Sequence, residues 1–354
     1  MNFNEVRCQP LSKEAMAKMQ ARLDNLAKPV KGLGRLEELA DHLAGIYGTS
    51  DFDVKPRKCL VFAADSGVVH EGVSASPQKI TAIQAVNMMN GHTAVAALAK
   101  AFNCHLQVYD IGINAELNSP LVEENKIRQE TGDMLVEPAM TVDEARRAVQ
   151  YGFDKGIEAY QAGNQVIAVG ELGMGNTTAA SAIIAAILGK TGEEVAGRGS
   201  NISDERLKHK IAVINKSLDR AGFSGKKNND ALTVLSEVGA LELGAMAGAI
   251  LAAGAMRKPV LLDGFLSYSA ALLASTINPE IIAYMIPTHK SKEHGSQIVL
   301  QALGLAPYID IDMCVGEKRL TIDKHHARLA VNAATIMADF ILSVEKKSDG
   351  ETNY

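Results

Sequence analysis

The sequence predicts an α/β protein in which a parallel sheet is flanked by helices. Short apolar runs recur along the 354 residues, and segments with helical periodicity separate them. Apolar runs without alternation are typical of parallel strands that are buried on both faces. Strands that alternate with helices form a parallel sheet covered on both sides and joined by right-handed crossovers.

The N-terminal part is predicted to be helical. Ser12 has the position of an N-cap for a helix over 13–27. A second helix is expected over 35–47, where leucines and isoleucine recur on one face. Polar residues over 50–58 then mark the boundary with the first strand.

The predicted strands and helices alternate from there on. The strands are expected over 58–65, 105–111, 164–169, 259–263 and 280–286. The helices are expected over 77–99, 142–161, 177–188, 203–221, 239–256 and 325–344. In such sheets ligands bind beyond the carboxyl ends of the strands, so the residues after each strand are the candidates for function.

Composition and charge exclude several classes of protein. Hydrophobic residues make up 47% and charged residues 22%, which argues against disorder and coiled coil. The net charge is −5 and no basic tail is present, so we expect neither nucleic acid nor a membrane as partner. Aromatic residues make up only 5% and glycines number 30, so small side chains must build a core in which elements approach closely.

Cysteine and histidine usage points to a cytoplasmic protein without metal. The four cysteines are scattered without CxxC spacing, which excludes a disulfide framework and structural zinc. His289 and His294 are poorly spaced as metal ligands. The first residues lack the apolar core of a signal peptide. The apolar stretch 238–256 is interrupted by Glu242, so we expect a buried helix there and not a membrane span.

The glycine-rich segment 169–178 carries the clearest functional signal. Gly173 and Gly175 free backbone N–H groups to point at an anion, and Thr177 and Thr178 are expected to cap the next helix. No Lys precedes the Thr pair, so the segment is not a Walker A loop. A tight turn that uses glycine for geometry alone is the alternative, but position and chemistry favour phosphate binding. Glu171 would repel a phosphate, so it faces a ribose hydroxyl or polarises a leaving group.

Other strand ends carry weaker signals. The segment 197–201 resembles a second backbone nest for an anion. Lys210, in the following helix, is either solvated, as most helix lysines are, or a phosphate counter-ion. Ser76 before Pro77 has the position of an N-cap, and Gln84 two turns later reaches a ligand or faces solvent. The polar cluster 288–295 suits a substrate carboxylate or hydroxyl.

Glu317 follows an apolar stretch. Apolar surroundings raise the pKa of a carboxyl group, which would suit a general base. A surface ion pair with its Lys and Arg neighbours is the alternative.

Together these segments resemble the nicotinate-nucleotide–dimethylbenzimidazole phosphoribosyltransferases. The matching segments are 28–40, 64–75, 170–181, 197–199, 245–250, 262–265 and 315–317. The combination of GNTTAAS with LDGF is highly specific. The resemblance implies a large α/β domain with a Rossmann-like sheet over 55–324, a small helical domain made from 1–54 and 325–354, and a dimer.

The resemblance also implies a reaction and its residues. A 5-phosphoribosyl group would pass from nicotinate mononucleotide to an aromatic lower-ligand base, with inversion to an α bond, release of nicotinate and no cofactor. Glu317 would be the general base, and Glu171 would lie near the reacting centre. The implied binding residues are Ser76, Gln84 and Val315 at the acceptor, Gly173, Met174, Gly175, Asn176 and Thr177 around the phosphoribosyl group, Gly199, Ser200 and Lys210 at the phosphate, and Ser291 near nicotinate.

The sequence departs from the family pattern on the acceptor and nicotinate sides. Ser66 stands where the family usually has His, Lys290 and Lys292 alter the segment after the fifth strand, and Lys318-Arg319 replace Gly-Thr after Glu317. Relatives that glycosylate phenols, some as paired paralogous subunits, therefore give a second hypothesis: phenol or p-cresol as acceptor, in a heterodimer. A non-catalytic subunit that binds the nucleotide and an unrelated nucleotide-binding enzyme are the remaining alternatives.

Overall fold

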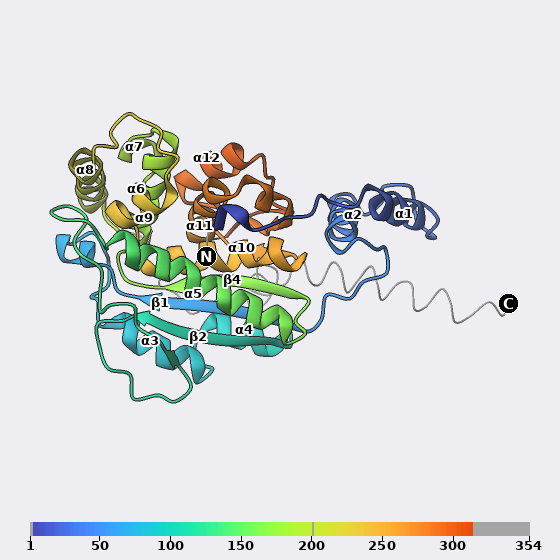
Figure 1. Ribbon diagram of the computed structural model, residues 1–354, viewed down its shortest axis with the longest axis horizontal. Helices are drawn as coiled ribbons and strands as arrows, with labels where there is room; N and C mark the ends of the chain where they lie inside the picture. The colour runs from blue at the N-terminus through green and yellow to red at the C-terminus, as the bar shows by residue number, and fades with distance from the viewer. Residues whose placement is uncertain (1–2, 200–201, 314–354) are drawn as a thin grey trace.

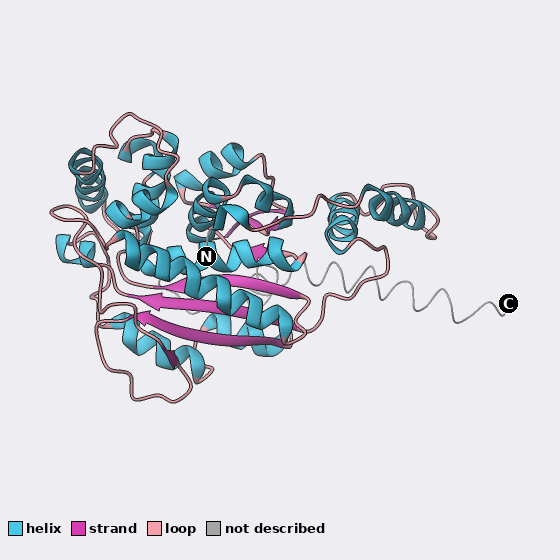
Figure 2. Cartoon of the chain, in the orientation of Figure 1, coloured by secondary structure: helices cyan, strands magenta, loops and turns pink. Residues whose placement is uncertain are grey.

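A six-stranded, fully parallel sheet with helices on both faces forms the centre of the protein (Figures 1 and 2). The computed structural model describes residues 3–199 and 202–313. The strands are β1 (Arg57–Ala64), β2 (Cys104–Gly112), β3 (Glu123–Glu124), β4 (Val166–Leu172), β5 (Val260–Leu262) and β6 (Met285–Pro287). The predicted fold class is confirmed.

The strand order is β3-β2-β1-β4-β5-β6, which is the order of a Rossmann sheet. The central strand β1 pairs with β2 from Arg57 opposite Cys104, and with β4 from Arg57 opposite Val166. The chain reverses its direction of winding between β1 and β4, so the topological switch point lies there. A crevice beyond the carboxyl ends of these two strands is the expected place for a ligand.

Helices cover both faces of the sheet. The helices with contacts to the sheet or to one another are α1 (Lys13–Asp24), α2 (Arg35–Tyr47), α3 (Ile80–Met89), α4 (Ala94–Ala101), α5 (Val142–Gln161), α6 (Asn176–Leu188), α7 (Gly192–Val195), α8 (Asp204–Arg220), α9 (Ala231–Val238), α10 (Leu241–Met256), α11 (Phe265–Ile277) and α12 (His294–Leu303). Figure 1 shows α5 and α10 on one face and α3 and α4 on the other. A short second sheet pairs β7 (His289–Ser291) with β8 (Ile309–Met313).

Most of the predicted elements are confirmed. Ser12 caps α1 by accepting a hydrogen bond from the Ala15 N–H, and α2 and α5 have the predicted bounds. The single helix expected over 77–99 is wrong, because Gly91 adopts a φ of +81° and Thr93 caps a new helix, α4. Ser76 is not an N-cap, since α3 begins only at Ile80.

The strand expected over 280–286 is largely wrong. Pro279 begins a 3₁₀ helix over Pro279–Tyr284, and Asn278 caps it by accepting the Glu280 N–H, so only Met285–Pro287 joins the sheet as β6. The sequence patterns also did not predict the helices α7, α9, α11 and α12 or the short strands β3, β7 and β8. The helix predicted over 325–344 lies outside the described residues, so the small domain made from both chain ends stays a prediction.

The stretch 238–256 is buried inside the protein, as expected. It forms α10, in which Glu242 is completely buried. In the ranges 3–199 and 202–313, no helix is long and apolar enough to cross a membrane.

Glycines bring α5 and α10 into backbone contact. A Cβ atom on Gly152 would lie 1.8 Å from the carbonyl oxygen of Ala245, and one on Gly248 would lie 1.9 Å from that of Val149. No side chain other than hydrogen fits at either position. Helix α10 packs on β1 and β4 as well as on α5. The close approach of the two helices therefore helps to determine where the α10 side chains lie relative to the strand ends.

Substitution of one of these glycines is expected to destabilise the fold. Gly152→Ala places a methyl group where the Ala245 carbonyl now lies, so α5 must move away from α10. We expect the free energy of unfolding to fall by about 2 kcal/mol or more, measured by denaturant titration. The exposed α5 variant Arg147→Ala should change it by less than about 0.5 kcal/mol. Equal stability of the two variants would contradict the backbone contact.

Candidate functional site

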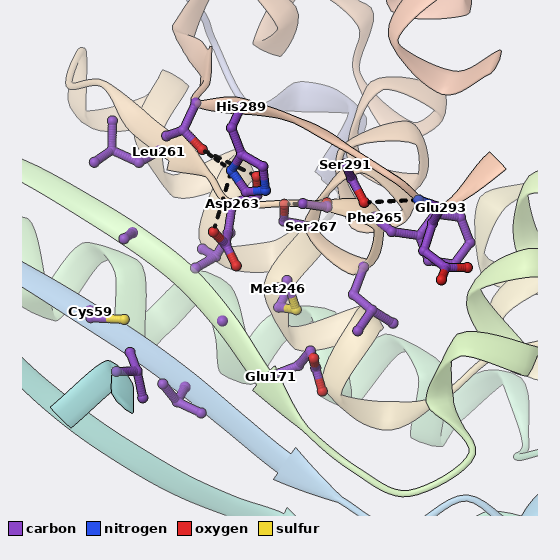
Figure 3. Close-up of a pocket in the computed structure, with 18 of the residues that line it drawn as sticks. Cys59, Glu171, Met246, Leu261, Asp263, Phe265, Ser267, His289, Ser291 and Glu293 are labelled. Carbon is purple, nitrogen blue, oxygen red and sulfur yellow. Dashed lines mark hydrogen bonds and ion pairs between the residues drawn. The ribbon is translucent and has the colours of Figure 1, made fainter. Parts of the chain in front are cut away.

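A pocket of about 380 Å³ opens beside the carboxyl ends of β4 and β5. Small residues of β4, Ala168 and Gly170, leave room for it, and α3 reaches it with Met88. Apolar side chains from β1, α10, β5 and α11 complete its floor: Cys59, Val61, Met246, Leu261, Phe265 and Leu266. Figure 3 shows Glu171 on one side of this pocket, with His289, Ser291 and Glu293 on the other.

Glu171 is the carboxylate at the switch point. It lies at the end of β4, and the side-chain amide of Asn176 donates a hydrogen bond to its Oε2. Burial raises the pKa of Glu171 to about 7 from the usual 4.5, Asn176 acts in the opposite direction, and the Asp263 carboxylate adds to the rise. A group with this pKa can hold or release a proton near neutral pH.

The glycine-rich turn after β4 brings the backbone close to the end of β1. A Cβ atom on Gly173 would lie 2.5 Å from the carbonyl oxygen of Ala64. Gly175 has a φ of +89° and is the N-cap of α6, without a side-chain hydrogen bond. The expectation that Thr177 and Thr178 cap this helix is therefore wrong, because both lie inside its first turn.

A completely buried carboxyl group lies below the turn. Glu242 on α10 is 0% exposed, and its Oε1 is 3.1 Å from the position that a Cβ atom on Gly173 would take. Burial raises the pKa of Glu242 well above its usual range, and the neighbouring Glu171 and Asp65 carboxylates raise it further. Burial and these neighbouring carboxylates therefore favour the protonated form of Glu242. Nothing in the local sequence connects Glu242 with the site, although a lone Glu in an apolar helix is a usable signal.

Lys210 supplies a buried positive charge on the far side of the turn. It is 1% exposed, and its Nζ donates to Thr177 Oγ1 at 2.9 Å and to the Gly197 carbonyl at 3.1 Å. Burial lowers the pKa of Lys210 to about 8, and the Glu293 carboxylate counteracts this. Of the two alternatives for Lys210, the solvated one is therefore wrong. Gly199, with a φ of +54°, lies against Thr177 and Lys210.

Segment 288–293 forms the opposite wall. His289 is buried, with Nδ1 3.1 Å from Thr288 Oγ1 and 3.8 Å from a carboxylate oxygen of Asp263. Glu293 accepts a hydrogen bond of 2.8 Å from the Gly199 N–H. The sequence points to this polar cluster but not to Asp263, His289 or Glu293 individually, for which position after a strand is the only signal.

The structure brings most of the predicted residues together. Glu171, Thr177, Gly199 and Ser291 line the pocket, and Lys210 lies directly behind Thr177. The other residues expected around the phosphoribosyl group lie in the adjoining glycine-rich turn: Gly173, Met174, Gly175 and Asn176.

The residues expected at the acceptor that the structure describes are not found at this pocket. Ser76 and Gln84 are half-buried and are not among the residues that line the pocket. Ser200, Val315 and Glu317 lie outside the described residues. Within the part of the chain that the structure describes, no group of three or more His, Cys, Asp or Glu side chains could hold a metal ion.

Comparison with known proteins identifies the family. The family described as "Phosphoribosyltransferase" matches residues 8–339. The chain belongs to this family. It is therefore an enzyme of the glycosyltransferase class, and the resemblance recognised from its motifs is confirmed.

Similar proteins support this membership over nearly the whole chain. A nicotinate-nucleotide–dimethylbenzimidazole phosphoribosyltransferase of Chloroflexus aggregans is 42% identical over 87% of each chain. One of Clostridioides difficile is 39% identical over 87% of each chain. A crystal structure of the enzyme with this name from Thermus thermophilus superposes with a TM-score of 0.83 at 36% identity, covering 94% of this chain and 96% of that one.

The raised pKa of Glu171 predicts a pH-dependent stability. Between pH 4.5 and about 7 the folded protein keeps a proton on Glu171 that the unfolded chain has lost, so this group makes stability fall as pH rises through that window. Glu171→Gln removes the titration. We expect the free energy of unfolding of this variant, relative to the wild type, to rise by about 1 to 2 kcal/mol between pH 4.5 and pH 8, a value reduced because the Glu171 side chain is partly exposed. Parallel pH profiles from denaturant titrations would show that Glu171 titrates normally.

Proposed function

We propose that the protein transfers a 5-phosphoribosyl group from nicotinate mononucleotide to a dimethylbenzimidazole-type base and releases nicotinate. The observation that carries this proposal is the buried Lys210 ammonium group at the edge of a pocket that also contains Glu171. A cation and a carboxylate on opposite sides of the glycine-rich turn suit the two ends of a ribose 5-phosphate. The names of the similar enzymes agree with these substrates.

The phosphate end of the donor would lie at Lys210. Burial of an ammonium group costs free energy unless an anion compensates it. The Gly199 N–H and the Thr177 hydroxyl lie beside Nζ and would add hydrogen-bond donors, with Ser200 as a further proposed ligand. Gly173, Met174, Gly175 and Asn176 would hold the ribose through the turn.

Glu171 would act at the reacting carbon. Departure of nicotinate develops positive charge at ribose C1, and a nearby carboxylate stabilises that charge. Attack from the face opposite to the leaving group inverts the configuration and gives the α bond. Positioning of the two substrates supplies much of the remaining acceleration.

The acceptor side is proposed from the family resemblance. Glu317 would remove the acceptor proton, Val315 would pack on the acceptor ring, and Ser76 and Gln84 would contact it. Ser291 would lie beside nicotinate, and it lines the pocket together with Phe265. We further propose that the chain works as a cytoplasmic dimer, either with itself or with a paralogue, as the family resemblance implies.

An assay with separate acceptors tests the function. The purified protein, nicotinate mononucleotide and dimethylbenzimidazole should release nicotinate and form the α-riboside phosphate, detected by chromatography and NMR. Release with phenol or p-cresol but not with dimethylbenzimidazole would replace the proposed acceptor with a phenol. No release with any acceptor, with the donor still bound, would show a non-catalytic nucleotide-binding subunit.

Lys210 is expected to determine donor affinity. Lys210→Met removes the ammonium group from the phosphate, and charged hydrogen bonds contribute about 1.5 to 3 kcal/mol. The Kd for nicotinate mononucleotide, measured by calorimetry, should rise by about tenfold or more. Lys208→Met, an exposed position on the same helix, should leave it unchanged. A donor affinity that is equal in both variants would place the phosphate elsewhere.

A further inference from the structure

Glu293 places a carboxylate where the donor phosphate is proposed to bind. Its Oε1 accepts a hydrogen bond of 2.8 Å from the Gly199 N–H. Its Oε2 packs against Gly197, where an added Cβ atom would lie only 1.8 Å from that oxygen. Oε2 is buried and has no hydrogen-bond partner among the residues that the structure describes. One carboxylate oxygen of Glu293 is therefore hydrogen-bonded to the backbone at Gly199, and the other is buried without a hydrogen bond.

The carboxylate also acts on the buried cation. Its charge counteracts the lowering of the Lys210 pKa by burial, although Nζ makes its hydrogen bonds to Thr177 and Gly197. Carboxylates and phosphates are both oxyanions that bind N–H and ammonium donors. Two anions cannot occupy this space together, because like charges at such distances repel strongly.

We propose that Glu293 is a built-in competitor of the donor phosphate, and that the phosphate binds only by displacing its carboxylate from Gly199. This inference rests on the proposed function, because it takes the Gly199–Lys210 region as the phosphate site. Phosphate can bind only in the fraction of molecules in which Glu293 has left Gly199. The apparent affinity for phosphate is therefore the intrinsic affinity multiplied by that fraction. Glu293 thereby makes the site selective for ligands whose anionic charge exceeds that of a carboxylate.

Glu293 also lies next to the residue proposed for the nicotinate end of the pocket. The Glu293 N–H donates to Ser291 Oγ at 3.3 Å, and both residues line the same pocket (Figure 3). Ser291 is the residue proposed to lie beside nicotinate. The proposed phosphate end and the proposed nicotinate end of the site are therefore only two residues apart in this segment.

Glu293→Gln tests the competition. The glutamine oxygen still accepts the Gly199 N–H but carries no charge, so the nest keeps its order. Calorimetry with inorganic phosphate at pH 7, where Lys210 is mostly protonated, should give a Kd about five- to tenfold lower than in the wild type, because a neutral amide oxygen binds the Gly199 N–H more weakly than a carboxylate and does not repel the incoming anion. Glu205→Gln, exposed on α8, removes the same charge elsewhere and should leave the Kd unchanged. Equal or weaker phosphate binding by Glu293→Gln overturns the proposal.

Two further measurements separate the possible failures. If Lys210→Met does not weaken phosphate binding, the phosphate site of the proposed function is wrong. If Lys210→Met weakens it but Glu293→Gln does not strengthen it, only the competition is refuted. Hydrogen exchange on the wild-type protein tests displacement without any variant. Saturating phosphate should speed exchange in 292–296, and unchanged or slower exchange there contradicts displacement.

Discussion

The backbone contact between α5 and α10 is the constraint on which the rest of the structure depends. Gly152 and Gly248 allow the two helices to touch without intervening side chains. Since α10 also packs on β1 and β4, its depth determines what lies below the strand ends. Glu242 is thereby held directly under the glycine-rich turn, and Met246 reaches the pocket floor. The small-residue composition of the chain is thus a condition for the site and for the core alike.

The site combines ionisable groups whose charged forms burial makes unfavourable. Desolvation raises the pKa of Glu171 and Glu242 and lowers that of Lys210. Packing holds these groups in place, since Glu171 ends β4, Lys210 lies on α8, which packs on α6, and Glu242 lies on α10, which packs on α5. A phosphorylated sugar would meet a cation at one end and a carboxylate at the other. Such preorganised charges stabilise a charged transition state without reorganisation during the reaction.

Local patterns predicted the parts of the chain in which one signal dominates. The apolar run of β1, the periodicity of α5 and the cap at Ser12 agree with the structure. The errors occur where two signals compete. The apolar run 280–286 begins as a 3₁₀ helix because Pro279 and the Asn278 cap favour that start. Thr177 and Thr178 looked like caps, but the left-handed Gly175 takes that position.

The sequence by itself determined the α/β class, the positions of most of the main strands along the chain and the glycine-rich turn after β4, because these depend on local periodicity and on backbone freedom. It also contained the motifs by which the family is recognised. Only the tertiary structure decided that Lys210 is buried, that Glu242 lies under the turn and that Glu293 reaches the Gly199 N–H. These are contacts between segments far apart in the chain, and burial and pKa depend on all the atoms that surround a group, which no local pattern specifies.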